Sequence, residues 1–145
     1  MKKIPKLCLP VVMMLVGCSE RIEISSQSEI VYDYDLVSDK HIEWKSIFEQ
    51  EDDNYYVYIY SMTCGPCRII KDDVISYALS HGNFYFVIYS ASIPLINNRD
   101  LVIGKDSIYG LGIMGTPSLF EINSHVITNY YLGTSEIIET LSNHQ

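Results

Sequence analysis

The chain has 145 residues, of which 48% are hydrophobic, so it has the length of one domain and enough apolar side chains to fill one core. It contains 18 acidic and 10 basic residues. This excess of negative charge opposes binding to nucleic acid or to an anionic lipid surface, because both would repel the chain.

The first 17 residues are typical of a secretory signal peptide. Three lysines within the first six residues precede an apolar run from Leu7 to Val16, which is too short to span a bilayer as a stable helix. The run ends in LVGC at residues 15–18, which resembles the lipobox of bacterial lipoproteins. The resemblance implies cleavage before Cys18 and attachment of lipid to it. An ordinary signal peptide, or an uncleaved anchor with a chance cysteine, is the alternative.

Cleavage at this position predicts the organisation of the chain. Residues 1–17 form the lipoprotein signal peptide, residues 18–30 the lipidated cysteine and a polar, Ser-rich tether, and residues 31–145 the folded domain. Loss of three lysines leaves seven basic residues against 18 acidic ones, a net charge of −11. We expect the domain on the extracytoplasmic side of a bacterial cell membrane or outer membrane, held by acyl chains such as palmitate on Cys18.

The predicted elements begin with residues 30–37 (IVYDYDLV), whose alternating apolar and acidic residues predict a short, half-exposed strand. Asp39 is placed to cap a helix. The run YYVYIY at residues 55–60 then suits a central strand buried on both faces of a sheet. The inner face of the Asp39 helix would carry Ile42, Trp44 or Lys45, Ile47 and Phe48.

In the middle of the chain, the sequence predicts a helix from Arg68 to Leu79 that ends at the His-Gly-Asn of residues 81–83. A second buried strand is predicted at residues 84–89. The segment from Ser90 to Tyr109 predicts a loop with a short helix at about residues 106–111. The helix from Arg68 would bury Ile70, Val74, Tyr77 and Ala78.

The last part of the chain predicts an antiparallel hairpin of residues 118–122 and 126–131 around an Asn-Ser-His turn. Gly133 ends the second strand, and Thr134 or Ser135 caps a final helix with Glu136 in its first turn. The predicted order is strand, helix, strand, helix, strand, helix, strand, strand, helix, which belongs to the α/β class. The last helix would bury Ile137, Ile138 and Leu141.

Cys64 and Cys67 enclose two residues in the sequence TCGPCR. A pair at this spacing can supply half of a zinc site, a structural disulfide or a redox-active dithiol. After processing, Cys8 is removed and Cys18 is lipidated, so Cys64 and Cys67 can pair only with each other or with a partner protein. A bridge across two residues constrains the unfolded chain very little, which disfavours a purely structural role.

The position between a buried strand and a helix favours redox chemistry. Cys64 would lie at a helix N-terminus, where unpaired amides stabilise a thiolate and lower the thiol pKa. Cys67, one turn further and more enclosed, would stay protonated until it resolves a mixed disulfide. Zinc is disfavoured because the four histidines lack paired spacing, and no other bound metal, flavin or nucleotide is implied. These histidines are His41, His81, His125 and His144.

The strand YVYIYS, the CGPC motif and the later MGTPSLF resemble the thioredoxin family, and the resemblance extends over about residues 30–141. It implies a thioredoxin fold, with a central mixed β-sheet flanked by helices on both faces. It also implies that Cys64 attacks and Cys67 resolves. A cis Thr116-Pro117 bond would form a ledge for the substrate, which Gly65 and Pro66 would also contact.

Two positions depart from the thioredoxin pattern. Tyr58 stands where thioredoxins usually carry a buried acid, and Thr63 stands where they usually carry Trp immediately before the motif. Without the acid, proton transfer from Cys67 must go through water or another group. The twelve tyrosines need no binding role, since aromatic residues pack well in strands.

The sequence therefore predicts an extracytoplasmic, membrane-anchored thiol-disulfide oxidoreductase. It would reduce disulfides of exported partner proteins and be recharged by an electron donor that the sequence does not identify. A dedicated helper of one maturation pathway is a close alternative. From another class, the alternative is a thioredoxin-fold binding or accessory module without redox turnover.

Overall fold

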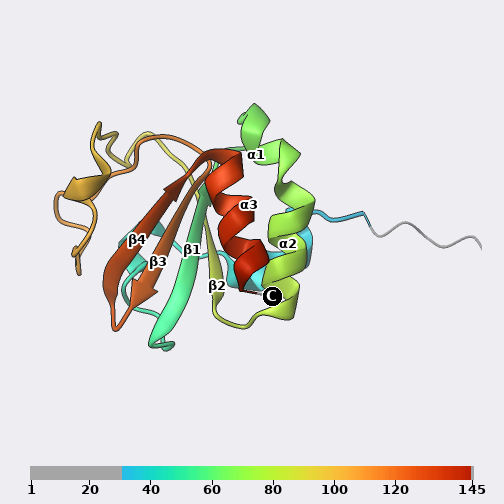
Figure 1. The fold of residues 1–145 in the computed structure, drawn as a ribbon, viewed down its shortest axis with the longest axis horizontal. Coiled ribbons are helices and arrows are strands. Elements are labelled where there is room, and N and C mark those ends of the chain that lie inside the picture. The colour runs from blue at the N-terminus through green and yellow to red at the C-terminus, as the bar shows by residue number, and fades with distance from the viewer. Residues whose placement is uncertain (1–30, 145) are drawn as a thin grey trace, which may run out of the picture.

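The computed structural model describes residues 31–144, so the predicted signal peptide, Cys18 and the tether up to residue 30 lie outside the described residues. Four strands form one sheet in the order β2-β1-β3-β4 (Figure 1). β1 is parallel to β2 and antiparallel to β3, and β3 is antiparallel to β4. The strands are β1 (Asn54–Tyr60), β2 (Phe84–Ile88), β3 (Ser118–Asn123) and β4 (Val126–Leu132).

The α-helices of the described residues pack on one face of this sheet, the helical face (Figure 1). They are α1 (Gly65–Ile69), α2 (Lys71–Ser80) and α3 (Gly133–Asn143). A parallel β1-α-β2 unit followed by an antiparallel hairpin and a terminal helix is the connectivity of the thioredoxin fold. The predicted α/β class and mixed central sheet are confirmed.

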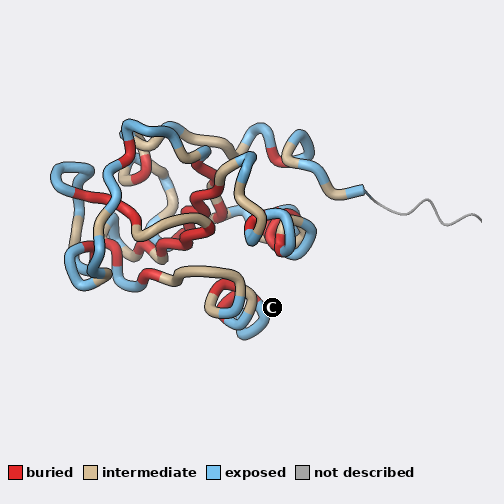
Figure 2. Tube along the Cα trace, turned by 90° about the horizontal axis from the view of Figure 1, so that it is seen from above, coloured by how far each residue is buried: buried red, intermediate tan, exposed pale blue. Residues whose placement is uncertain are grey.

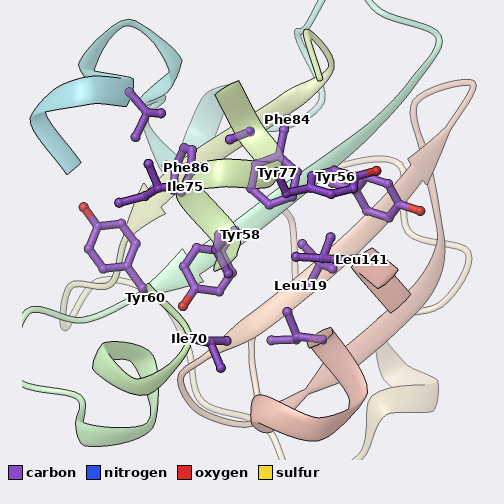
Figure 3. Close-up of a cluster of buried hydrophobic side chains, with 14 of the residues drawn as sticks. Tyr56, Tyr58, Tyr60, Ile70, Ile75, Tyr77, Phe84, Phe86, Leu119 and Leu141 are labelled. Atoms are coloured by element: carbon purple, nitrogen blue, oxygen red, sulfur yellow. The ribbon is translucent and has the colours of Figure 1, made fainter. Parts of the chain in front are cut away.

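Alternate residues of β1 point to opposite faces of the sheet, and both faces are buried. On the helical face, Tyr56, Tyr58 and Tyr60 form a row with side chains of β2 and the helices. Figure 3 shows the rings of Tyr58 and Tyr60 side by side, with centroids 5.8 Å apart. Phe84 and Phe86 extend the row with centroids 5.3 Å apart. Such aromatic pairs each add about 0.5–1.5 kcal/mol beyond their area burial.

The opposite face, called here the loop face, is covered by two short 3-10 helices and irregular chain. The 3-10 helices are η2 (Trp44–Ser46) and η3 (Arg99–Leu101). Ile47 is fully buried against this face, and its carbonyl oxygen accepts a 2.7 Å hydrogen bond from the hydroxyl of Tyr55. In Figure 2 the buried residues concentrate along the strands, and the connecting loops are largely exposed.

Gly112 allows two parts of the irregular chain that covers the loop face to pack closely together. A Cβ atom at this position would lie 2.6 Å from the carbonyl oxygen of Pro94, so only glycine allows this close approach. The contact lets Ile113 donate a 2.9 Å hydrogen bond to Pro94, and Ile96 donate one of the same length to Ile113. The irregular segment after β2 is thereby fastened beside the chain that leads to Pro117.

The strand predicted at residues 30–37 is wrong, because a 3-10 helix, η1 (Tyr34–Lys40), occupies most of that segment. The carboxylate of Asp33 accepts a 2.7 Å hydrogen bond from the Tyr34 amide and turns the chain into the helix. Only Val37 of η1 is buried. The period-2 alternation was therefore a misleading signal.

The helix predicted from Asp39 is also wrong. His41 forms a parallel bridge with Phe86, and the amide of Ile42 donates a 2.9 Å hydrogen bond to the Phe86 carbonyl. This short extended segment occupies the residues where the predicted helix would begin, and only the three residues of η2 are helical after it. The predicted apolar side chains nevertheless face the core, since Ile42, Trp44, Ile47 and Phe48 all pack on the loop face.

The helix predicted from Arg68 to Leu79 is present but starts earlier and is divided. α1 begins at Gly65 and α2 ends at Ser80, with a break at Ile70, where φ is −101° and ψ is 6°. The four predicted inner residues of this helix are all buried. The strands predicted at residues 55–60, 84–89, 118–122 and 126–131 are confirmed within one residue at each end.

Two details near the C-terminal half differ from the prediction. No helix forms at residues 106–111; the helical turn is η3, where the Asn98 side chain accepts a 2.9 Å hydrogen bond from the Asp100 amide. α3 starts at Gly133, and neither Thr134 nor Ser135 caps it. Glu136, in the first turn as predicted, accepts a 3.0 Å hydrogen bond from the Leu132 amide instead.

Candidate redox site

The end of β1 places the first cysteine of the motif. After Tyr60 the chain turns, and the amide of Cys64 donates a 3.1 Å hydrogen bond to the carbonyl of Ser61. Cys64 then serves as the N-cap of α1. Pro66, which has no backbone N–H, fits in the first turn because the first turn of a helix needs no amide donor. Cys64 therefore lies just beyond the C-terminal end of the central strand β1, and Cys67, in α1, lies in the core.

Cys64 and Cys67 are joined by a disulfide, with their Cα atoms 5.2 Å apart. Cys67 is buried, with 1% of its surface exposed, and belongs to the core of the helical face, whereas Cys64 is only partly buried at the edge of that core. The amide of Cys67 donates a 3.1 Å hydrogen bond to the sulfur of Cys64. The two sulfurs thus differ in access, and the more accessible one faces a backbone donor.

The loop before β3 forms the second wall of the site. The Thr116-Pro117 peptide bond is cis, and Pro117 is buried. The carbonyl oxygen of Thr116 lies 3.4 Å from the sulfur of Cys64. The structure therefore brings together the two parts of the site that are about fifty residues apart in the sequence. Pro117 also accepts a 3.0 Å hydrogen bond from the Gly133 amide, where β4 passes into α3.

Tyr130 of β4 holds this loop from the loop face. Its hydroxyl accepts a 2.7 Å hydrogen bond from the Met114 amide and is 2.8 Å from the hydroxyl of Ser118. The Ser118 hydroxyl donates a 2.6 Å hydrogen bond to the carbonyl of Gly115. Burial raises the pKa of Tyr130, so it stays a neutral hydroxyl. The residues on both sides of Thr116-Pro117 are thus fixed by one buried polar cluster.

The sequence does not reveal this supporting cluster. Its pattern predicts only that Tyr130 lies in a strand and that Ser118 begins β3. The one signal in the sequence is that Ser118 begins an otherwise apolar strand face. The structure buries this residue fully, and a buried hydroxyl needs a partner.

Tyr58 occupies the core beneath the motif. Among the described residues, only Tyr58 and Tyr34 have buried side-chain hydroxyls without a hydrogen bond of acceptable geometry, although each hydroxyl influences the pKa of the other. Burial raises the pKa of Tyr58 far above its usual range, and raises that of Tyr34 to about 12. A tyrosine in this state stays protonated at neutral pH and is a poor proton acceptor.

Tyr60, the last residue of β1, forms a second polar contact on the helical face. Its hydroxyl lies 2.8 Å from Nε2 of His41, whose Nδ1 lies 3.0 Å from the carbonyl oxygen of Val37. Tyr34 stacks on the Tyr60 ring with centroids 3.9 Å apart. These contacts fasten η1 to the end of the strand that leads to Cys64.

The remaining predicted site residues border the disulfide. Gly65 is partly buried and Pro66 is exposed at the start of α1. Thr63 is exposed and its hydroxyl lies 3.1 Å from that of Ser61. Met62 is a large apolar side chain with 68% of its surface exposed. The motif therefore has an open, partly apolar border.

Within residues 31–144, no group of three or more His, Cys, Asp or Glu side chains is arranged to hold a metal ion. Over the same residues, no helix combines the length and the apolar character needed to cross a bilayer. His41, His81 and His125 each lie within hydrogen-bond distance of a backbone carbonyl.

Comparison with known proteins finds similarity only among solved structures. No protein-family model matches the chain, and no curated protein is significantly similar to it. Chlamydomonas reinhardtii thioredoxin f2 matches with 18% identity and a TM-score of 0.49, covering 72% of this chain and 94% of its own. Oxidized mitochondrial thioredoxin 3 from Saccharomyces cerevisiae matches with 10% identity and a TM-score of 0.49, covering 74% and 97%. Plasmodium falciparum thioredoxin matches with 13% identity and a TM-score of 0.49, covering 73% and 99%.

The strand order and the Cys64-Cys67 disulfide define the class without help from these similarities. The chain is a thioredoxin-fold protein with a CxxC disulfide at the end of its central strand. This arrangement is suited to thiol-disulfide exchange, because one sulfur is accessible and the second is held within bonding distance of it.

Proposed function

We propose that the protein is an extracytoplasmic thiol-disulfide oxidoreductase that reduces disulfides in exported partner proteins. One observation carries the proposal: the accessible sulfur of Cys64 lies between the Cys67 amide and the Thr116 carbonyl, with the buried Cys67 bonded to it. A disulfide that only stabilised the fold would gain less by closing so short a loop than by closing a long one.

The reaction follows from the different positions of the two sulfurs. In the reduced protein the Cys64 thiolate attacks one sulfur of the substrate disulfide, so a Cys64-substrate bond forms and the other substrate sulfur leaves as a thiolate. Cys67 then loses its proton and attacks Cys64, which releases the second substrate thiolate and restores the Cys64-Cys67 disulfide. Two electrons pass to the substrate, and a dithiol donor must return them to the protein.

The Cys67 amide supports the role of Cys64 as the attacking sulfur. A hydrogen bond from a backbone N–H favours the charged form of its acceptor, so it stabilises a thiolate at Cys64. Gly65 and Pro66, which follow Cys64 at the start of α1, would contact the substrate beside this sulfur. An extended substrate segment would lie against Thr116 and Pro117, whose backbone can pair with it as a strand does.

The proton of Cys67 goes to water rather than to Tyr58. Tyr58 replaces the acid expected at this position, and its raised pKa keeps it neutral. We expect resolution by Cys67 to be the slow step at low pH, because nothing in the buried core of the helical face is placed to accept the proton.

The test is a trapping experiment with Cys67→Ser. An oxidoreductase of this design accumulates mixed disulfides with substrate proteins through Cys64, visible as reductant-sensitive bands on gels. Cys64→Ser is the matched control and gives no such bands. Bands from neither variant would favour the alternative of a binding module without redox turnover, and bands of equal intensity from both would contradict Cys64 as the attacking sulfur.

We also propose that lipid on Cys18 anchors the mature protein to the outer leaflet of a bacterial membrane. The support is the LVGC sequence after a basic and apolar leader. Labelled palmitate is expected to enter the wild-type chain but not Cys18→Ala. Label retained by Cys18→Ala would show that the anchor is elsewhere.

A further inference from the structure

The outer edge of the sheet is only partly covered beside the redox site. β2 is an edge strand, and its one partner on the outer side is the short extended piece at His41 and Ile42. The chain leaves that edge at once, because η2 begins at Trp44. A strand edge left open in this way can pair with another extended chain.

The backbone groups of Ile88 lie on this open stretch. The carbonyl of Asn83 accepts a hydrogen bond from the Tyr56 amide of β1, and the amide of Tyr89 donates one to the Tyr60 carbonyl of β1. Alternate residues along β2 therefore direct their backbone groups toward β1. The residues between them direct theirs outward, as the hydrogen bond from Ile42 to the Phe86 carbonyl shows. Ile88 follows the same alternation. Within residues 31–144, no hydrogen bond outside the sheet uses its amide or carbonyl.

Two hollows meet at the same edge. One, of about 560 Å³, lies between the His41–Lys45 segment and the end of β2. The other, of about 470 Å³, lies between η1 and the end of β1 and reaches Met62. Both hollows are lined by His41 and Ile88, so they adjoin at this edge, the first toward the loop face and the second toward the helical face. Together they are called here the β2-edge groove. Its Met62 end is two residues from Cys64.

The groove has an apolar floor and an acidic rim. Met62 and Ile88 are exposed by 68% and 50%, and Trp44, which lines the same hollow as Ile88, is partly exposed. Asp33, Asp35 and Glu43 line the groove, against Lys45 as the only Lys or Arg among its described lining residues; His41 lines both hollows. Lys45 is paired with Glu43 at 2.7 Å, and Lys71 lies 3.9 Å from Asp33. Asp35 forms no ion pair with any described residue.

We propose that the β2-edge groove binds an extended segment of the substrate protein that carries apolar and basic side chains, and so presents the adjacent disulfide to Cys64. The segment would add to the sheet edge at Ile88, place apolar side chains near Met62 and Trp44, and pair a basic side chain with Asp35. This inference rests on the proposed function, whose substrate class it names.

The charge of the groove argues against occupation by the chain's own N-terminal segment. Residues 19–30 contain three acidic residues and one basic residue. Such a segment would be repelled by the acidic rim. A basic partner is favoured for the same electrostatic reason.

The binding test uses Trp44, the single tryptophan of the chain, as an internal probe in the groove. A short peptide of alternating Val and Lys without cysteine is titrated into the oxidised full chain. We expect a saturable change of Trp44 fluorescence that weakens with salt. The same peptide with Glu in place of Lys, or with alternate amides N-methylated, is expected to give none. No change with the Lys peptide, or equal changes with all three, would overturn the proposal.

A charge variant localises the contact. Asp35→Lys is expected to weaken binding of the Lys peptide several-fold, while Asp106→Lys, which makes the same charge change at an exposed position outside the groove, leaves it unchanged. Equal weakening by both variants would show an effect of net charge alone and contradict a specific groove.

A kinetic comparison separates the groove from the redox chemistry. With a cysteine-containing form of the Lys peptide as a disulfide dimer, Asp35→Lys should lower kcat/KM several-fold, while its rate with the small uncharged disulfide bis(2-hydroxyethyl) disulfide stays that of wild type. Equal loss on both substrates would overturn the groove. Wild type that binds the Lys peptide but reduces neither disulfide would contradict the proposed function and leave the groove standing.

Discussion

The two faces of the sheet support the redox site in different ways. The helical face holds Cys67 through apolar and aromatic packing, and leaves the hydroxyls of Tyr34 and Tyr58 without hydrogen bonds. The loop face holds Thr116 and Pro117 through the hydroxyls of Tyr130 and Ser118, which are fully engaged. One half of the site is therefore positioned by packing, and the other half by a buried polar cluster.

This difference has a physical consequence for how each half tolerates change. Apolar packing has no preferred direction, so it positions a residue only as precisely as the neighbouring side chains fill the space around it. A buried hydrogen-bond cluster fixes both distance and direction, but loses its stabilising effect when one member is removed. Mutations that remove single atoms should therefore distinguish the two faces, whereas mutations that remove whole rings should not.

The largest expected effect is the same on both faces. Phe86→Ala on the helical face and Phe120→Ala on the loop face each remove a fully buried ring, and each should lower the free energy of unfolding by about 3–5 kcal/mol. Urea unfolding measures both, with exposed Leu101→Ala as a control expected within about 0.5 kcal/mol of wild type. A loss below about 1 kcal/mol for either phenylalanine variant would show that its face is loosely packed.

A matched pair of hydroxyl deletions should separate the faces. Tyr130→Phe leaves the partly buried Met114 amide and the buried Ser118 hydroxyl without this partner, and should cost about 1–3 kcal/mol. Tyr58→Phe removes a hydroxyl that is buried without a partner, and should leave stability unchanged or increase it. Unfolding of both variants in urea gives the comparison. A larger cost for Tyr58→Phe than for Tyr130→Phe would contradict the assignment of the polar support to the loop face.

A smaller effect is expected where the two faces are tied together. Arg99 of η3 donates two hydrogen bonds to Glu136 of α3, at 3.1 and 3.2 Å. The Arg99 side chain and the Leu132 amide lower the pKa of Glu136 from its ordinary value of 4.5. The carboxylate therefore stabilises the fold above that pH, and this contribution disappears as the pH falls through the lowered pKa.

Glu136→Gln tests this tie. Because both side chains are 43% exposed, the variant should lose less than about 1 kcal/mol at neutral pH. The difference from wild type should shrink as the pH is lowered below 4.5, as followed by thermal unfolding. A difference that stays constant with pH would show that the loss comes from packing rather than from the charge.

Much of the helical face could be predicted from the sequence. Val74, Tyr77 and Ala78 recur at helical spacing, and the unbroken apolar runs of β1 and β2 have no other place than a buried sheet. The CGPC motif then follows β1 directly, so its position at the strand end required no long-range information. Local patterns were sufficient because α2 buries one regular stripe and β1 is buried on both faces.

The loop face could not be predicted in the same way, because its cover has no regular period. Ile42, Trp44 and Ile47 were correctly expected inside, but the helix assigned to them was wrong, since Ile42 is held by a hydrogen bond to the distant Phe86. The Tyr130 cluster depends on contacts between β4 and the loop before β3. Neither signal is local, so neither can be read from one segment of the sequence.

The most direct test of the redox site is the reactivity of its two cysteines in the reduced protein. Site-resolved alkylation with iodoacetamide, followed by mass spectrometry across pH, measures the rate at Cys64 and at Cys67 separately. Cys64 should react much faster, with an apparent pKa below the free-cysteine value of about 8.5, and Cys67 should stay protected by burial. Equal rates, or faster alkylation of Cys67, would contradict the assignment of Cys64 as the attacking sulfur.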